Sequence, residues 1–255
     1  MITSGATHYA STIGRRMTKP TQALCFDVFG TVTDWYGSIL KEAQSLPQTR
    51  QLNIPWDAFV LKWRRDGYLA SLKKIVAGEM DLLATAEINK RKLLELLQEY
   101  DIQGLSPGEI EHFNLSWNRL EAWEDVVAGL HQLKEDFLIM PFSNGDYRCL
   151  LDISKRNNLP WDGIISADFF KKVKPDPTIY KDAIDLLQMA PENVMMVACH
   201  AHDLNAAKKA GMKTAYVDRP LEFGGHDAED AVKAAYDIEA TDFVDLARQL
   251  KETKL

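Results

Sequence analysis

Short apolar runs alternate along most of this chain with stretches in which apolar residues recur every three or four positions. The first run ends at Phe26, the carboxylate of Asp27 follows it, and Gly30 comes soon afterwards. An apolar run of this length that is followed by a glycine predicts a buried strand opening into a tight loop. Further runs of the same kind predict strands at residues 138–142, 163–166, 194–198 and 213–217.

Helical periodicity fills the intervals between these strands. It predicts helices over residues 126–135, 147–157, 177–187 and 204–210, and Gly211 stands at the C′ position of the last one. Strands that alternate with helices in this way indicate a parallel sheet with helices on both of its faces. We therefore predict an α/β fold with a doubly wound parallel sheet.

A region of purely helical character follows the first strand. Its apolar spacing predicts helices at residues 38–45, 56–75, 80–100 and 109–120. No strand is expected between residues 36 and 122. An all-helical insertion at this point of the chain suggests a cap over the site, so we expect a helical cap domain at residues 37–122. The core domain is then expected to consist of residues 20–36 and 123–255.

The N-terminal segment, residues 1–19, has its own composition. It contains Arg15, Arg16 and Lys19, several Ser and Thr, and no acidic residue. This composition fits a flexible tail, and it also resembles an organellar transit peptide. We expect a flexible tail on a cytoplasmic protein, with organellar targeting as the alternative.

The overall composition narrows the class of protein. Of the 255 residues 46% are apolar and 26% are charged, an ordinary balance for a globular chain that can build a core and a cap. The net charge is −7 and no basic stripe is present, so we expect no nucleic acid as a partner. No apolar run approaches the length of a membrane span. The three cysteines have neither paired nor metal-type spacing, which points to a reducing compartment.

Asp27 is the first candidate for chemistry. Ligands of parallel α/β sheets bind just beyond the carboxyl ends of the strands. A carboxylate at this place stands against an apolar wall and is poorly hydrated, which favours a nucleophile or a metal ligand. The structural alternative is an aspartate that caps a helix or starts a turn. Asp27 alone does not decide between the two readings.

Polar residues also follow the other predicted strands. Ser143 and Asn144 can form an ordinary turn, and Asp203 can cap a helix or lie in its first turn. Lys174, in a loop between strands, can simply be solvated. Because strand ends lie side by side in a parallel sheet, the case for a site depends on the joint placement of all these residues. The candidates are Asp27, Ser143, Asn144, Lys174, His200, His202 and Asp203.

Four motifs in fixed order make the sequence resemble the haloacid dehalogenase superfamily over nearly all of residues 22–220. The motifs are Asp27-Val28-Phe29-Gly30-Thr31-Val32, Ser143-Asn144-Gly145, Lys174-Pro175-Asp176-Pro177 and the final Asp203. The resemblance implies a Rossmann-like core, a nucleophilic Asp27 and a helical cap between the first strand and the second motif.

The first and fourth motifs indicate a branch of this superfamily. Most members are magnesium-dependent phosphatases with a second aspartate, a general acid, at the position of Phe29. Phenylalanine cannot donate a proton, and a halide leaving group needs none because it is a weak base. The extra metal-binding acid expected shortly before Asp203 is also missing, and magnesium requires hard oxygen ligands. The sequence therefore looks like a type II 2-haloacid dehalogenase, without cofactor and without metal.

That resemblance implies a reaction and its participants. Asp27 would attack the halogen-bearing carbon of a short 2-haloalkanoic acid, the L-enantiomer by resemblance, and water would hydrolyse the resulting ester to a 2-hydroxy acid. Lys174 would keep Asp27 ionised. Thr31 and Ser143 would hydrogen-bond Asp27 or the substrate carboxylate. Asp203 would position Lys174 or help to activate the water.

The leaving halide needs a pocket with apolar walls and a few donors. Phe29 supplies apolar surface beside the nucleophile. In the family an arginine directly after a tryptophan on a cap helix binds the halide, which favours Arg64 after Trp63, with Arg65 as the alternative. Surface arginines on a helix are the competing explanation. Asn144 would be a second halide donor.

The fourth motif departs from the dehalogenase pattern Ser-x-Asn-x-Trp-Asp. His200 stands at the asparagine position and His202 at the tryptophan position. The departure leaves two readings open: His200 orients water and His202 lines the halide pocket, or the substrate differs. A zinc site on the two histidines is disfavoured, because alternate residues near a strand end point to different faces.

Two other functions remain as alternatives. One is a magnesium-dependent phosphatase that uses fewer acids than its relatives. The other is a non-catalytic binding or regulatory protein on a retained fold. The resemblance also suggests a homodimer, although the sequence contains no recognisable interface signal.

Overall fold

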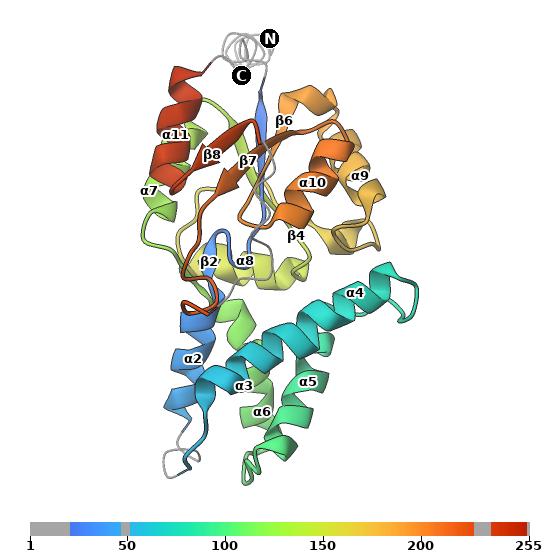
Figure 1. Ribbon diagram of the computed structural model, residues 1–255, viewed down its shortest axis with the longest axis vertical. Helices are drawn as coiled ribbons and strands as arrows, with labels where there is room; N and C mark the ends of the chain where they lie inside the picture. Colours follow the sequence, from blue (N-terminus) through green and yellow to red (C-terminus); the bar gives the residue numbers. More distant parts are fainter. Residues whose placement is uncertain (1–20, 47–51, 227–235, 254–255) are drawn as a thin grey trace, which may run out of the picture.

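A parallel β-sheet forms the centre of the protein (Figure 1). The computed structural model describes residues 21–46, 52–226 and 236–253. Its six-stranded sheet has the order β5-β4-β1-β6-β7-β8, and every neighbouring pair is parallel. The strands are β1 Ala23–Phe26, β4 Leu138–Ser143, β5 Ile165–Ser166, β6 Val194–Ala198, β7 Lys213–Val217 and β8 Ile238–Ala240. The α/β fold expected from the alternating pattern is therefore confirmed.

Helices cover both faces of the sheet. Along β1, Leu24 and Phe26 pack with one set of helices, whereas Ala23 and Cys25 pack with another, because side chains alternate across a strand. The first set is α7 Val126–Lys134, α8 Tyr147–Arg156 and α11 Phe243–Glu252, and the second is α9 Pro177–Leu187 and α10 Ala201–Lys209. Burial on both faces explains why β1 is apolar at every position.

A helical insert, residues 35–119, lies beyond one end of the sheet (Figure 1). It comprises α2 Trp35–Ser45, α3 Trp56–Lys62, the π-helical segment η2 Trp63–Leu69, α4 Ala70–Val76, α5 Thr85–Glu99, α6 Pro107–Asn114 and the 3-10 helix η3 Leu115–Arg119. The chain enters and leaves the insert through two short antiparallel strands, β2 Thr33–Asp34 and β3 Glu121–Ala122. The boundaries predicted for a cap fall beside this pair. The division into two domains stays a prediction.

Several predicted elements differ from the observed ones. The expectation of no strand between residues 36 and 122 is wrong, because β3 is too short to produce an alternating pattern. The helix expected at 80–100 begins only at Thr85, where Asp146 accepts the N–H groups of Thr85 and Ala86. The helix expected at 204–210 begins at Ala201.

Other parts of the chain were not anticipated. The sequence patterns did not reveal β8, α11 or the short 3-10 helices η4 Ala167–Phe169 and η5 Pro191–Asn193. The tail expected at residues 1–19 lies outside the described residues. None of the helices in the described ranges is long and apolar enough to cross a membrane.

Candidate active site

Asp27 follows directly after β1, the strand between β4 and β6. Its backbone N–H donates to the carbonyl of Val197 on β6 at 3.0 Å, which fixes the residue at the end of the sheet. The loop then turns at Gly30, whose φ is +96°. A Cβ atom at Gly30 would lie 2.2 Å from Oε1 of Glu222, so both the backbone conformation and the space require glycine here.

Lys174 links the two aspartates of the site. Its Nζ lies 3.0 Å from Oδ1 of Asp27 and 2.5 Å from Oδ2 of Asp203. The hydroxyl of Tyr180 donates to the other oxygen, Oδ1, of Asp203 at 2.5 Å. All four groups are buried, so the ammonium and the two carboxylates hold one another in place. Asp203 thus contacts Lys174 directly, while its role, positioning Lys174 or activating the water, stays a prediction.

These contacts determine the charge of Asp27. Burial alone would raise the pKa of its carboxyl, but Lys174 and His200 outweigh burial and hold that pKa well below its ordinary value. For Lys174, burial acts to lower the pKa, whereas Asp203 and Asp27 raise it above the ordinary value. Both groups are therefore charged across the physiological pH range.

The two oxygens of Asp27 have different surroundings. Thr31 donates its Oγ1–H to Oδ2 at 2.9 Å, and Nδ1 of His200 lies 3.1 Å from the same oxygen. Oδ1 contacts only the ammonium of Lys174 among the described side chains. Oδ1 therefore has one hydrogen-bond partner among the described side chains, whereas Oδ2 has two.

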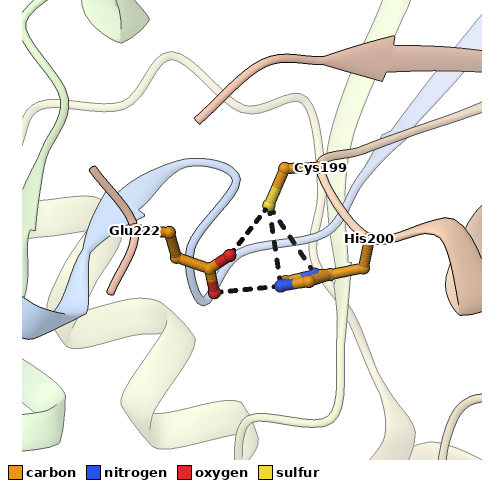
Figure 2. A group of neighbouring side chains, drawn as sticks. All are labelled: Cys199, His200 and Glu222. Atoms are coloured by element: carbon orange, nitrogen blue, oxygen red, sulfur yellow. Dashed lines mark hydrogen bonds and ion pairs between the residues drawn. The ribbon is translucent and has the colours of Figure 1, made fainter. Parts of the chain in front are cut away.

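Glu222 is a site residue that sequence analysis missed. Its Oε1 lies 2.9 Å from Nε2 of His200, and its Oε2 accepts from Sγ of Cys199 at 3.6 Å (Figure 2). Oε1 also accepts the indole N–H of Trp35 at 3.1 Å. It lies in the loop after β7, a strand that the sequence does predict. Its place in the loop that follows a predicted strand was the sequence signal that could have identified Glu222 as a site residue.

The His200 ring bridges two carboxylates. Burial disfavours its charge, but Cys199, Glu222 and Asp27 together raise the pKa of His200 well above its ordinary value. Because burial also raises the pKa of the Cys199 thiol, that thiol stays neutral and the two carboxylates account for the effect on the ring. Burial tends to raise the pKa of Glu222, but the His200 charge holds it below the ordinary value. His200 is thus an imidazolium between two anions.

Three residues are candidate metal ligands because their donor atoms lie within 4.8 Å of one another: Cys199, His200 and Glu222 (Figure 2). Sγ lies at nearly equal distances from Nδ1 and Nε2 of the ring, 3.8 and 3.6 Å, so it is not in line with either nitrogen lone pair. Both ring nitrogens already contact carboxylates. The two ring nitrogens of His200 are thus engaged by Asp27 and Glu222 as the residues stand, and the three donors carry no metal assignment here.

The arginine chosen from the sequence lies inside the protein. Arg64 is buried on η2, and its Nε and Nη1 have no hydrogen-bond partner within the described structure. Its guanidinium lies over the rings of Phe29, Trp35 and Tyr68, at 5.7, 5.3 and 4.6 Å from their centres. π-helical turns are frequent at functional sites. Arg65, the alternative, lies over Phe223 instead.

A cavity of about 570 Å³ lies between the sheet end and the insert. Arg64 is among its lining residues and Arg65 is not. Thr31 lies beneath Asp27 and does not reach the cavity. The predicted site residues that line it are Asp27, Phe29, Arg64, Asn144, Lys174, His200, His202 and Asp203. The structure therefore places eight of the predicted site residues around one cavity, although they come from separate parts of the chain.

Asn144 of the second motif hydrogen-bonds the backbone of Lys174 in the third motif. The amide of Asn144 donates to the carbonyl of Lys174 at 3.0 Å and accepts its N–H at 2.7 Å. Ser143 Oγ accepts the N–H of Gly145 at 3.1 Å and makes no hydrogen bond with Asp27 in the described structure, so that expected contact is wrong. The hydroxyl is buried within its own turn. A contact of Ser143 with the substrate, and a halide contact of Asn144, remain predictions.

His202 lies closer to His200 than the sequence argument assumed. Because α10 begins at Ala201, His202 belongs to a helix rather than to alternating strand positions. The two rings stack with their centres 5.4 Å apart. The strand-face argument against a paired-histidine site was therefore wrong, although the contacts of His200 with Asp27 and Glu222 still disfavour it.

These observations define the class of protein. It is an α/β protein with an ionised carboxylate at the end of a central strand, a buried lysine beside that carboxylate, and a cavity that both residues line. The chain belongs to the haloacid dehalogenase-like hydrolase family, whose model matches residues 21–211.

Among its relatives is the (S)-2-haloacid dehalogenase 4A of Burkholderia cepacia, 26% identical over 206 residues, which are 80% of this chain and 85% of that protein. Two solved structures are similar over nearly the whole length. An L-2-haloacid dehalogenase is 35% identical with a TM-score of 0.84, covering 90% of this chain and 99% of that one. A defluorinating L-2-haloacid dehalogenase is 36% identical with a TM-score of 0.85, covering 91% and 95%.

Proposed function

We propose that this protein is a hydrolytic dehalogenase that converts short 2-haloalkanoic acids, of the L series, to 2-hydroxy acids and halide. One observation carries the proposal: the ionised Asp27 and the buried guanidinium of Arg64, with unpartnered N–H groups, line the same cavity. A nucleophile and an anion-binding group are the two parts that displacement of a halide requires. The names of the relatives, (S)- and L-2-haloacid dehalogenases, support it.

In the first half-reaction Oδ1 of Asp27 attacks the halogen-bearing carbon in line and expels halide. The new bond is an ester, and the carbon is inverted. Burial removes water from the carboxylate and so raises its reactivity. Phe29 packs edge-on against Tyr68 and Trp117, so the side chain two positions after the nucleophile is a fixed apolar ring that offers no proton. Arg64 binds the anionic substrate or the departing halide.

In the second half-reaction water adds to Cγ of Asp27. The bond between Cγ and Oδ1 then breaks, and Oδ1 leaves as the hydroxyl oxygen of the product. Lys174, 3.0 Å from Oδ1 in the free enzyme, donates the proton that this oxygen needs. Asp203 lines the cavity and accepts the first proton from the attacking water. The new Asp27 carboxyl returns a proton to Lys174, and the net proton leaves to solvent.

A phosphatase is a weaker candidate for this site. The position of its general acid is occupied by Phe29, and the ammonium of Lys174 lies between Asp27 and Asp203. Neither feature provides the hard oxygen ligands of magnesium.

The direct test measures chloride release from L-2-chloropropionate in excess chelator. We expect turnover that does not depend on added metal, and loss of at least about 10³-fold in Asp27→Asn, as for a covalent nucleophile. Phosphate release from a phosphate monoester, only with magnesium, would instead support the phosphatase. An Asp27→Asn variant with every property unchanged would contradict both enzymes.

A single turnover in H₂¹⁸O tests the covalent route. We expect the label in Asp27 and not in the first 2-hydroxy acid released, because the product takes its oxygen from Oδ1. Label in the first product would show direct attack by water. Peptide mass spectrometry of the region around Asp27 provides the measurement.

A further inference from the structure

The contacts of Oδ2 of Asp27 bear on the second half-reaction, hydrolysis of the ester. When water attacks the ester, negative charge forms on the carbonyl oxygen of Asp27. If Oδ1 carries the substrate, that oxygen is Oδ2. Donors aimed at the place where charge develops are worth more in a buried site than in water. Oδ2 has two such donors, Thr31 at 2.9 Å and His200 at 3.1 Å.

We propose that Thr31 and His200 form an oxyanion hole for hydrolysis of the Asp27 ester, and that Glu222 is the positioning residue that keeps the His200 ring oriented and cationic. The inference deepens the proposed function and rests on it. The bond that forms joins the water oxygen to Cγ, and the bond that breaks joins Cγ to Oδ1. His200 loses no proton in this step, since its Nδ1–H is donated to Oδ2 throughout.

Glu222 becomes most important once the ester exists. In the free enzyme His200 lies between two carboxylates, but esterification removes the charge of Asp27. Glu222, 2.9 Å from Nε2, is then the remaining anion in contact with the ring. It is itself buried and fixed by Trp35, so its charge cannot move away. A ring held only by Asp27 would lose its anionic partner when the ester forms, before the oxyanion develops.

Groups on several elements surround the ring. Cys199 precedes it, and burial keeps that thiol neutral. Arg64 on η2 contributes to the low pKa of Glu222. The groups around the ring are Asp27 and Thr31 of the loop after β1, Glu222 of the loop after β7, and Cys199 and His202 of its own segment. Glu222 and Asp27 are the two that oppose deprotonation of His200 by charge.

The test separates the two half-reactions in the full-length enzyme. In Glu222→Gln we expect a burst of about one equivalent of halide, followed by turnover slowed about 10-fold to 100-fold, the scale of a partner that acts through a neighbouring side chain. Intact-protein mass spectrometry then finds the Asp27 ester accumulated during turnover. His200→Ala, which leaves no side-chain donor at this position, is expected to slow hydrolysis by about 10²-fold, as for loss of one oxyanion donor.

The pH profile provides a readout that a structural role would leave unchanged. Hydrolysis needs the protonated ring, so kcat falls as pH rises through the His200 pKa. We expect this alkaline limb to lie at lower pH in Glu222→Gln than in the wild type. Glu42→Gln is the matched control, because it removes a half-buried carboxylate from an ion pair with Arg119. We expect kcat of this variant to fall at the same pH as in the wild type.

Clear outcomes would overturn the inference. Equal slowing of halide release and ester hydrolysis, without accumulated ester, removes the oxyanion role. An unmoved alkaline limb in folded Glu222→Gln removes the role of Glu222. If Glu222→Gln fails to fold, the burst experiment on His200→Ala decides the oxyanion role. No halide from the wild type would instead refute the proposed function.

Discussion

Arg64 lines the cavity of the candidate site, and its buried guanidinium lacks hydrogen bonds that would offset the free-energy cost of burying its charge. A buried guanidinium without hydrogen bonds on Nε and Nη1 is costly, and three aromatic rings offset only part of the cost. Strained or poorly satisfied groups of this kind cluster where function requires them. Stability and activity should therefore respond in opposite directions to its replacement.

We expect Arg64→Met to raise the free energy of unfolding by about 1 kcal/mol or more, because an apolar side chain suits this site better. The melting temperature should rise by about 2 °C or more, while kcat/KM for the 2-haloacid falls by about 10²-fold or more. Thermal melts and halide assays on the same preparation measure both. Arg65→Met is the control, expected to retain activity because Arg65 does not line the cavity. Reduced stability together with unchanged kcat/KM would contradict this assignment.

Residues at the site differed in how far the sequence could predict them. Asp27 and Lys174 lie in motifs whose order reveals their joint placement. Phe29 was informative because an aromatic ring cannot act as an acid. Glu222 belongs to no motif, and its role arises from a contact with His200 across the fold. Ser143 was assigned a contact with Asp27 or with the substrate carboxylate; in the structure its Oγ accepts the N–H of Gly145, and the substrate contact stays a prediction.

Helix boundaries at the insert depend on partners in the core. α5 starts at Thr85 because Asp146, at the start of α8, accepts two of its first N–H groups at 2.8 Å each. A cap supplied by another element leaves no local sequence signal, which is why periodicity placed the helix start too early. The π turn of η2 was hidden for a related reason: apolar spacing predicts a helix but not its hydrogen-bond pattern.

Asp146→Ala should lower the free energy of unfolding by about 1–2 kcal/mol, the usual cost of a lost helix cap. It should also lower kcat/KM, because α5 packs on η2, which carries Arg64. Asp152→Ala, on α8 as well, is the comparison variant. The Asp152 carboxylate binds Arg148 and Asn118, and we expect a smaller effect from its loss. Denaturant titration and halide assays provide the measurements. Equal losses in both variants would argue against a special role for this cap.

At the scale of the molecule, the cavity is larger than the chemistry at its base requires. Its volume of about 570 Å³ lies in the range of sites for drug-sized ligands. The insert contributes four apolar side chains to the lining, beside Lys73: Leu69, Leu72, Val76 and Ala77. We therefore expect the enzyme to accept 2-haloacids with alkyl chains longer than three carbons, which sequence motifs alone could not reveal.

Val76→Asp tests this wall without disturbing the core, since Val76 is 48% exposed. We expect kcat/KM for 2-bromooctanoate to fall about 10-fold, because a charge replaces apolar contact with the chain, while 2-chloropropionate is unaffected. Leu94→Asp on α5 is the matched control, at 47% exposure and outside the cavity. A uniform effect on both substrates would mean that no alkyl chain lies along Val76.

The paired strands β2 and β3 have a consequence for how such a protein can change over generations. The chain passes into the helical insert and out of it at adjacent points, Thr33 opposite Ala122. A gene could exchange the whole intervening stretch by recombination at these two points and leave the sheet with Asp27 and Lys174 untouched. The exchanged piece would carry Arg64 with it. Inheritance of the proposed nucleophile is thereby separable from inheritance of the proposed anion-binding group, so a core that keeps Asp27 and Lys174 could receive a different insert in a single event.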